Sequence, residues 1–99
     1  LSEEILGDAL SMRDREFVIA GIAALLHISP LRVEKIIAMK AAKPLIAMCW
    51  KAGMSMRFAL RLQQDVAKIP HTELVYPRGG TDYPLNEADI KWQLEFLGL

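Results

Sequence analysis

Ala24-Leu-Leu-His-Ile-Ser29 and Trp50-Lys-Ala-Gly-Met-Ser55, which begin 26 positions apart, follow one plan. Each closes an apolar stretch, breaks for three residues that end in serine, and leads into a second, amphipathic stretch. The apolar positions that follow are Val33, Ile36 and Ile37 in the first unit, and Ala59, Leu62 and Val66 in the second. Successive helical hairpins bury such stripes against one another. The sequence therefore predicts an all-α domain of about six helices in consecutive antiparallel hairpins, a helical-repeat-like bundle.

The length of 99 residues predicts one domain, and an apolar content of 53% excludes a disordered chain. Such a high apolar content also allows for burial that a partner surface completes. The longest apolar run without charge, residues 17–26, has ten residues, whereas a membrane span needs about 18. We therefore expect no contact with a membrane. This run predicts the central, buried helix of the bundle, because it is apolar on every side.

Formal charge is zero but unevenly distributed along the chain. Residues 13–43 carry six basic and three acidic side chains, and residues 44–68 carry four and one, whereas both ends of the chain are acidic. A basic middle binds a polyanion or is neutralised by the acidic ends, and we favour the second interpretation. Cys49 is the single cysteine, which predicts a reducing, cytoplasmic location without disulfides. A start at Leu1 without a signal peptide predicts a piece of a longer cytoplasmic protein.

Hydroxyl and amide side chains mark the expected helix starts. Ser2, Ser29 (before Pro30), Ser55 and Asn86 are predicted caps, and Ser11 with Asp14 resembles a capping box. Lys43-Pro44 is expected to end one helix and open the next. That next helix has two apolar faces over residues 45–52, so we expect it to pack on both sides, as an interior helix does. The helix after Ser55 is expected to reach about Lys68, and Gly53 and Gly98 to end their helices.

These boundaries divide the single domain, residues 1–99, into three parts. Residues 1–69 form the stack of helical hairpins, and residues 86–98 form a C-terminal helix that braces it. Between them, residues 70–85 hold three prolines and the pair Gly79-Gly80, which predicts a long, ordered loop.

The last helix carries more large apolar side chains than one face can bury. Either the helix folds back across the bundle, or its apolar side chains are left to be covered by a partner. We therefore predict a non-enzymatic protein-interaction module, with Trp92 and Phe96 as the candidate partner-binding residues. The expected partner is a protein, either a second copy or a different chain.

DNA binding is the alternative interpretation. Residues 22–33 resemble a helix-turn-helix, with small Ala23 or Ala24 in the first helix, a turn at 27–29 and Val33 as the apolar anchor. In the second unit the bulky Trp50 stands where a helix-turn-helix needs a small residue. The pattern is also not specific to DNA binding, because any tightly packed helical hairpin needs the same residue types. The candidate nucleic-acid contacts of this alternative are Arg32, Lys35, Arg57, Arg61 and Gln64.

Catalysis has little support in the sequence. The two histidines and the cysteine show no spacing typical of metal ligands, so no metal, cofactor or catalytic residue is predicted. An enzyme would need a pocket that gathers residues of the loop, namely His71, Arg78, Asp82 and Tyr83. Arg78-Gly-Gly-Thr81 is more typical of a turn than of a phosphate cradle, because it lacks the Gly-Lys-Ser/Thr ending.

Several segments resemble one known family. They are Phe17-Val-Ile-Ala-Gly-Ile-Ala-Ala-Leu25, Ile28-Ser-Pro30, Leu45-Ile-Ala-Met48 and Lys51-Ala-Gly-Met-Ser55. From Arg15 onward the chain resembles the later part of a family of uncharacterised helical proteins, found mainly in alphaproteobacteria and classified as a domain of unknown function. The resemblance implies an all-helical, repeat-like body within a longer protein, and it implies no activity.

Overall fold

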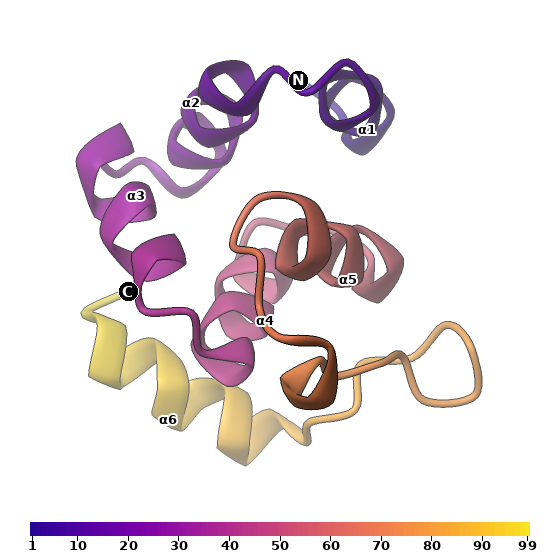
Figure 1. Ribbon diagram of the computed structural model, residues 1–99. Coiled ribbons are helices and arrows are strands. Elements are labelled where there is room, and N and C mark those ends of the chain that lie inside the picture. Colours follow the sequence, from indigo (N-terminus) through magenta and orange to yellow (C-terminus); the bar gives the residue numbers. More distant parts are fainter.

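The computed structural model describes residues 1–99 and contains six α-helices and no sheet (Figure 1). In chain order they are α1 (Glu3–Ser11), α2 (Arg15–Leu26), α3 (Pro30–Ala38), α4 (Ala42–Lys51), α5 (Met56–Asp65) and α6 (Glu87–Leu97). A 3₁₀ turn, η1 (His71–Glu73), begins the long loop, and Arg78 and Asp82 form an isolated β-bridge within it. The predicted all-α fold with about six helices is confirmed.

Local side-chain caps explain most of the helix starts. The side chains of Ser2, Ser29, Ser55 and Asn86 each accept a hydrogen bond from the backbone N–H three residues further on, as predicted. The predicted capping box of Ser11 and Asp14 is wrong. Asp14 itself caps α2 by accepting from the Phe17 N–H, whereas the Ser11 hydroxyl donates to the Gly7 carbonyl inside α1.

Two predicted boundaries also differ from the structure. The helix α4 begins at Ala42 without a side-chain cap, so Pro44 lies in its first turn, where a missing N–H has no consequence. The helix α5 ends at Asp65 rather than near Lys68: the backbone leaves the helix at Val66, with φ of −107°, and Lys68 is left-handed with φ of 52°.

The centre of the bundle is α4, not α2. Residues 44–49 are all buried, because α4 packs against α3, α5 and α6 on different sides. The expectation that residues 17–26 form the central helix is therefore wrong. One face of α2 is open to solvent at Phe17, Ala20 and Ala24, and the Phe17 side chain is 42% exposed. Both segments are apolar all round, and only the packing of α6 on α4 distinguishes them.

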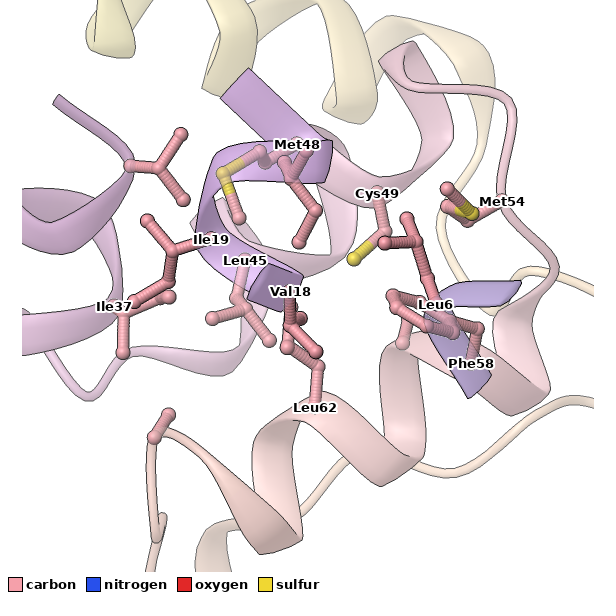
Figure 2. Packing of buried hydrophobic residues seen from close by; sticks show 14 of the residues in the cluster. Leu6, Val18, Ile19, Ile37, Leu45, Met48, Cys49, Met54, Phe58 and Leu62 are labelled. Carbon is pink, nitrogen blue, oxygen red and sulfur yellow. The ribbon is translucent and has the colours of Figure 1, made fainter. Parts of the chain in front are cut away.

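Figure 2 shows how the five N-terminal helices share one core. Leu6, Val18, Ile37, Met48 and Leu62 come from α1, α2, α3, α4 and α5, and all belong to a cluster of 21 buried residues. A second, smaller cluster joins α6 to α4 through Ala47, Ile90 and Leu94.

The turn between α2 and α3 makes a sharp corner, with the two helices bent by 112°. No single helix in the chain has both the length and the apolar character to cross a membrane. Only α2 and α3 taken together would satisfy both criteria, as a bent pair.

Candidate protein-interaction surface

The two faces of α6 have different roles. Ile90 and Leu94 point into α4 and are buried, whereas Trp92 and Phe96 lie on the opposite face, each 62% exposed. Because they are four positions apart in the helix, the two aromatic rings are neighbours on its surface. Their centroids are 5.9 Å apart and their planes differ by 2°, so the rings stack. Of the two alternatives that the sequence left open for this helix, the structure shows that it folds back against the bundle, with Trp92 and Phe96 left exposed.

The aromatic pair is carried by a firmly held helix. Asn86 caps the first turn of α6 by accepting from the Asp89 N–H at 2.8 Å. At the other end, Gly98 is left-handed with φ of 75°, and the Arg32 guanidinium donates to the carbonyls of Leu97 at 2.9 Å and Gly98 at 3.2 Å. A cation at the C-terminal end of a helix also opposes its dipole. The aromatic side chains therefore project from a fixed backbone.

Acidic residues flank the aromatic pair. Ala88, one turn before Trp92, extends the apolar stripe along the exposed face of α6. The other exposed residues of the helix include three acidic side chains and one basic: Glu87, Asp89, Glu95 and Lys91. This surface is thus a narrow apolar stripe inside a net negative rim, and we call it the aromatic face of α6.

The candidate nucleic-acid contacts are only partly available. Arg32 is bonded to the end of α6, as described above. Arg61 donates from Nη2 to the Gly7 carbonyl at 3.2 Å and to the Ser11 hydroxyl at 3.0 Å. The remaining candidates, Lys35, Arg57 and Gln64, are exposed. The candidates come from α3 and α5, which pack on different sides of α4 (Figure 1).

The loop residues named for a possible enzyme stabilise the loop itself. The Tyr83 hydroxyl donates to the Met54 carbonyl at 2.6 Å, and the Arg78 guanidinium donates to the Pro84 carbonyl at 2.9 Å. The backbones of Arg78 and Asp82 bond to each other around Gly79 and Gly80, so this segment is a turn, as predicted. His71 lies exposed in η1.

Two buried groups have shifted pKa values. Burial raises the pKa of the Cys49 thiol well above its ordinary value of about 9.0, and the nearby negative charge of Glu3 adds to this effect. Burial likewise raises the pKa of Tyr83, and negative charge on Cys49 and Glu3 adds to this effect. A thiol that stays protonated is a poor nucleophile, so Cys49 serves packing.

Sequence reasoning missed two polar contacts that position these elements. The carboxylate of Glu3 accepts from both the N–H and the hydroxyl of Ser55, each at 2.6 Å, and so fastens α1 to the start of α5. The Gln63 side chain, fully buried, bonds both backbone groups of Val75. The available signal was a glutamine on the otherwise apolar face of α5.

These features define a small all-α bundle with an exposed aromatic face. The family model for an uncharacterised protein conserved in bacteria (DUF2336) matches residues 1–88, so the chain belongs to that family. The match ends in the first turn of α6, before Trp92 and Phe96. No curated protein and no solved structure matches the chain.

Proposed function

We propose that this protein is a non-enzymatic interaction module of the bacterial cytoplasm, and that it binds a protein partner through the aromatic face of α6. The observation that carries the proposal is the stacked pair Trp92–Phe96, exposed on a helix that is held at both ends. Large aromatic side chains on a rigid backbone lose little conformational freedom on binding, and they dominate the energetics of protein interfaces.

The charges around the stripe specify the partner's chemistry. Glu87, Asp89 and Glu95 outnumber Lys91, so a complementary surface is apolar at its centre and basic at its rim. An amphipathic helix with lysine or arginine beside its apolar residues has this pattern. We therefore expect the partner to supply such a helix. The single buried cysteine accords with a reducing compartment, where this binding would occur.

Synthetic peptides test the proposal directly. A helical peptide with a leucine and phenylalanine stripe and a lysine rim should bind and shift the fluorescence of Trp92, whereas the same stripe with a glutamate rim should not. Isothermal titration should show that Trp92→Ala and Phe96→Ala each weaken binding by about tenfold or more. Tyr76→Ala is the matched control, because Tyr76 is an exposed aromatic residue of the loop, outside α6.

Three outcomes are informative. Equal binding of the two peptides would contradict the charge argument, and unchanged affinity in both aromatic variants would contradict the site. Sedimentation of the free protein tests self-association. A dimer that Trp92→Ala dissociates would identify a second copy as the occupant in place of a basic helix.

DNA binding remains the second candidate, because the 112° bend between α2 and α3 lies in the range of helix-turn-helix motifs. In that case Lys35 on α3 and Arg57 on α5 are exposed cations free to contact phosphates. Duplex affinity should then fall steeply with salt, and Lys35→Ala should reduce the slope. The absence of duplex binding at low salt would remove this candidate.

A further inference from the structure

Four helices of this protein are followed by a basic residue in the left-handed conformation. Arg13, His27, Lys40 and Lys68 have φ values of 59°, 57°, 50° and 52°, and each lies just beyond the end of a helix. Glycine adopts this conformation without strain, as at Gly53 after α4, whereas a residue with a Cβ does not. A basic side chain does offset the negative end of the helix dipole. That reason applies equally to Arg13, Lys40 and Lys68, wherever on the surface they lie.

Arg13 and Lys68 differ from the other two because they line the same cleft. The cleft has a volume of about 420 Å³ and lies between the end of α1, the turn into α2 and the C-terminal half of α5. Four of its lining residues are basic, Arg13, Arg15, Arg61 and Lys68, and two are acidic, Asp14 and Asp65. Strained backbone positions concentrate at functional sites, and here two of them bring cations to one concavity.

Only one of these four cations is in an ion pair within the chain. The single ion pair of the protein joins Arg15 to Glu34, so Arg13, Arg61 and Lys68 have no carboxylate within ion-pair distance. The bonds of Arg61 go to neutral oxygens of α1. Asp14, one of the two acidic residues, is occupied in capping the N-terminus of α2. With Asp14, Asp65 and the Glu34 carboxylate on Arg15 counted, the cleft keeps a small excess of positive charge, and Arg13, Arg61 and Lys68 form no ion pair.

We propose that this cleft binds a small molecule bearing a phosphate group. The guanidinium of Arg13 matches phosphoryl oxygens in geometry, Arg61 offers the guanidinium nitrogens other than the Nη2 that bonds α1, and Lys68 adds a point charge. The Gln64 amide, which also lines the cleft and is exposed, is a neutral polar group for the rest of the ligand. The volume falls within the range of small-molecule pockets and exceeds what one phosphate would occupy. The site involves α1, α2 and α5, so it does not depend on the aromatic face of α6.

The test titrates inorganic pyrophosphate into the 99-residue protein at constant ionic strength, with amide chemical shifts as the readout. We expect saturable shifts concentrated in residues 10–15 and 61–68. The double variant Arg13→Gly/Lys68→Gly removes two cations and relieves two strained positions, so it should stay folded and lose about tenfold or more in affinity. The matched control, His27→Gly/Lys40→Gly, relieves the same strain outside the cleft and should retain affinity within about twofold.

Other results would overturn the proposal. These are linear, unsaturable shifts, equal losses in the two double variants, or binding of duplex DNA through the cleft without binding of pyrophosphate. Arg13→Gln/Lys68→Gln repeats the measurement with the native backbone strain retained, so a folding defect in the glycine variant does not leave the result undecided.

Discussion

Gln63 shows how one side chain can hold a long irregular segment in place. Its Nε2 donates to the Val75 carbonyl at 2.9 Å, and its Oε1 accepts from the Val75 N–H at 3.0 Å. The amide thus supplies the two hydrogen bonds that a neighbouring strand would make to the backbone of Val75. No local pattern predicts this pair, because its members are separated by 12 positions and one of them lies in a loop without periodicity.

Replacing Gln63 tests this role. Gln63→Ala removes a buried side chain and leaves both backbone groups of Val75 without a partner, which should lower the free energy of unfolding by about 2–3 kcal/mol. Urea denaturation measures the change. The next residue provides the control, because Gln64 is exposed and Gln64→Ala should alter stability by less than about 0.5 kcal/mol. Similar losses in the two variants would contradict the role of the buried amide.

Cys49 links stability to alkaline pH. Its pKa is raised in the folded protein, so between the ordinary value near 9.0 and the folded value the unfolded chain has released a proton that the folded chain retains. Titration of Cys49 therefore leaves the free energy of unfolding unchanged below about pH 8 and lowers it as pH rises above 9. The expected slope approaches about 1.4 kcal/mol per pH unit. The raised pKa of Tyr83 steepens the decline above its ordinary value of 10.0.

Denaturation at a series of pH values checks this dependence. Cys49→Ala should flatten the slope between pH 9 and 10, whatever its effect on stability at pH 7. A profile that stays as steep in the variant would show that another group dominates.

At the scale of the element, the sequence predicts how helices start better than it predicts which helix is central. Ser2, Ser29, Ser55 and Asn86 were recognisable because a cap and its target N–H lie within four residues of each other. The assignment of the central helix failed because α2 and α4 are similarly apolar. Burial of α4 depends in part on α6, which is more than 30 residues further along the sequence, so no local pattern reveals it.

Helix ends give an element-scale prediction at Gly53. Its φ is 80°, and nothing lies within 4 Å of where a Cβ would be, so Gly53→Ala adds strain without a clash. We expect a loss of about 1–2 kcal/mol by thermal or urea denaturation. Gly53→Asn should cost less, because asparagine tolerates the left-handed region. Equal stability of the alanine variant and the native protein would mean that the turn after α4 relaxes freely.

At the scale of the whole molecule, the two hydrophobic clusters differ in size. The larger contains residues from each of the first five helices, α1 through α5. The smaller packs Ile90 and Leu94 of α6 against Ala47 of α4. Cooperative units often follow such divisions, so α6 should open more readily than the rest of the fold. The exposure of Trp92 and Phe96 follows from the same division. The sequence named both as candidate partner-binding residues, but it could not show which apolar residues of α6 face α4.

Native-state hydrogen exchange tests the division. Amides of α4 should exchange only through global unfolding, and those of α6 through a separate opening of lower free energy. Leu94→Ala should speed exchange in α6 while leaving α5 nearly unchanged, whereas Leu62→Ala in the main core should speed exchange in both. Uniform acceleration by Leu94→Ala would show that the molecule unfolds as one unit.

The hydrogen bonds that hold the chain on either side of the Arg78–Asp82 turn have a practical consequence. Val75 is held by Gln63 before the turn, and Tyr83 is held by the Met54 carbonyl after it, while Arg78 and the two glycines are exposed. Trypsin should therefore nick the chain after Arg78, and the two fragments should stay associated. Separately produced halves, residues 1–78 and 79–99, would then reassemble by complementation.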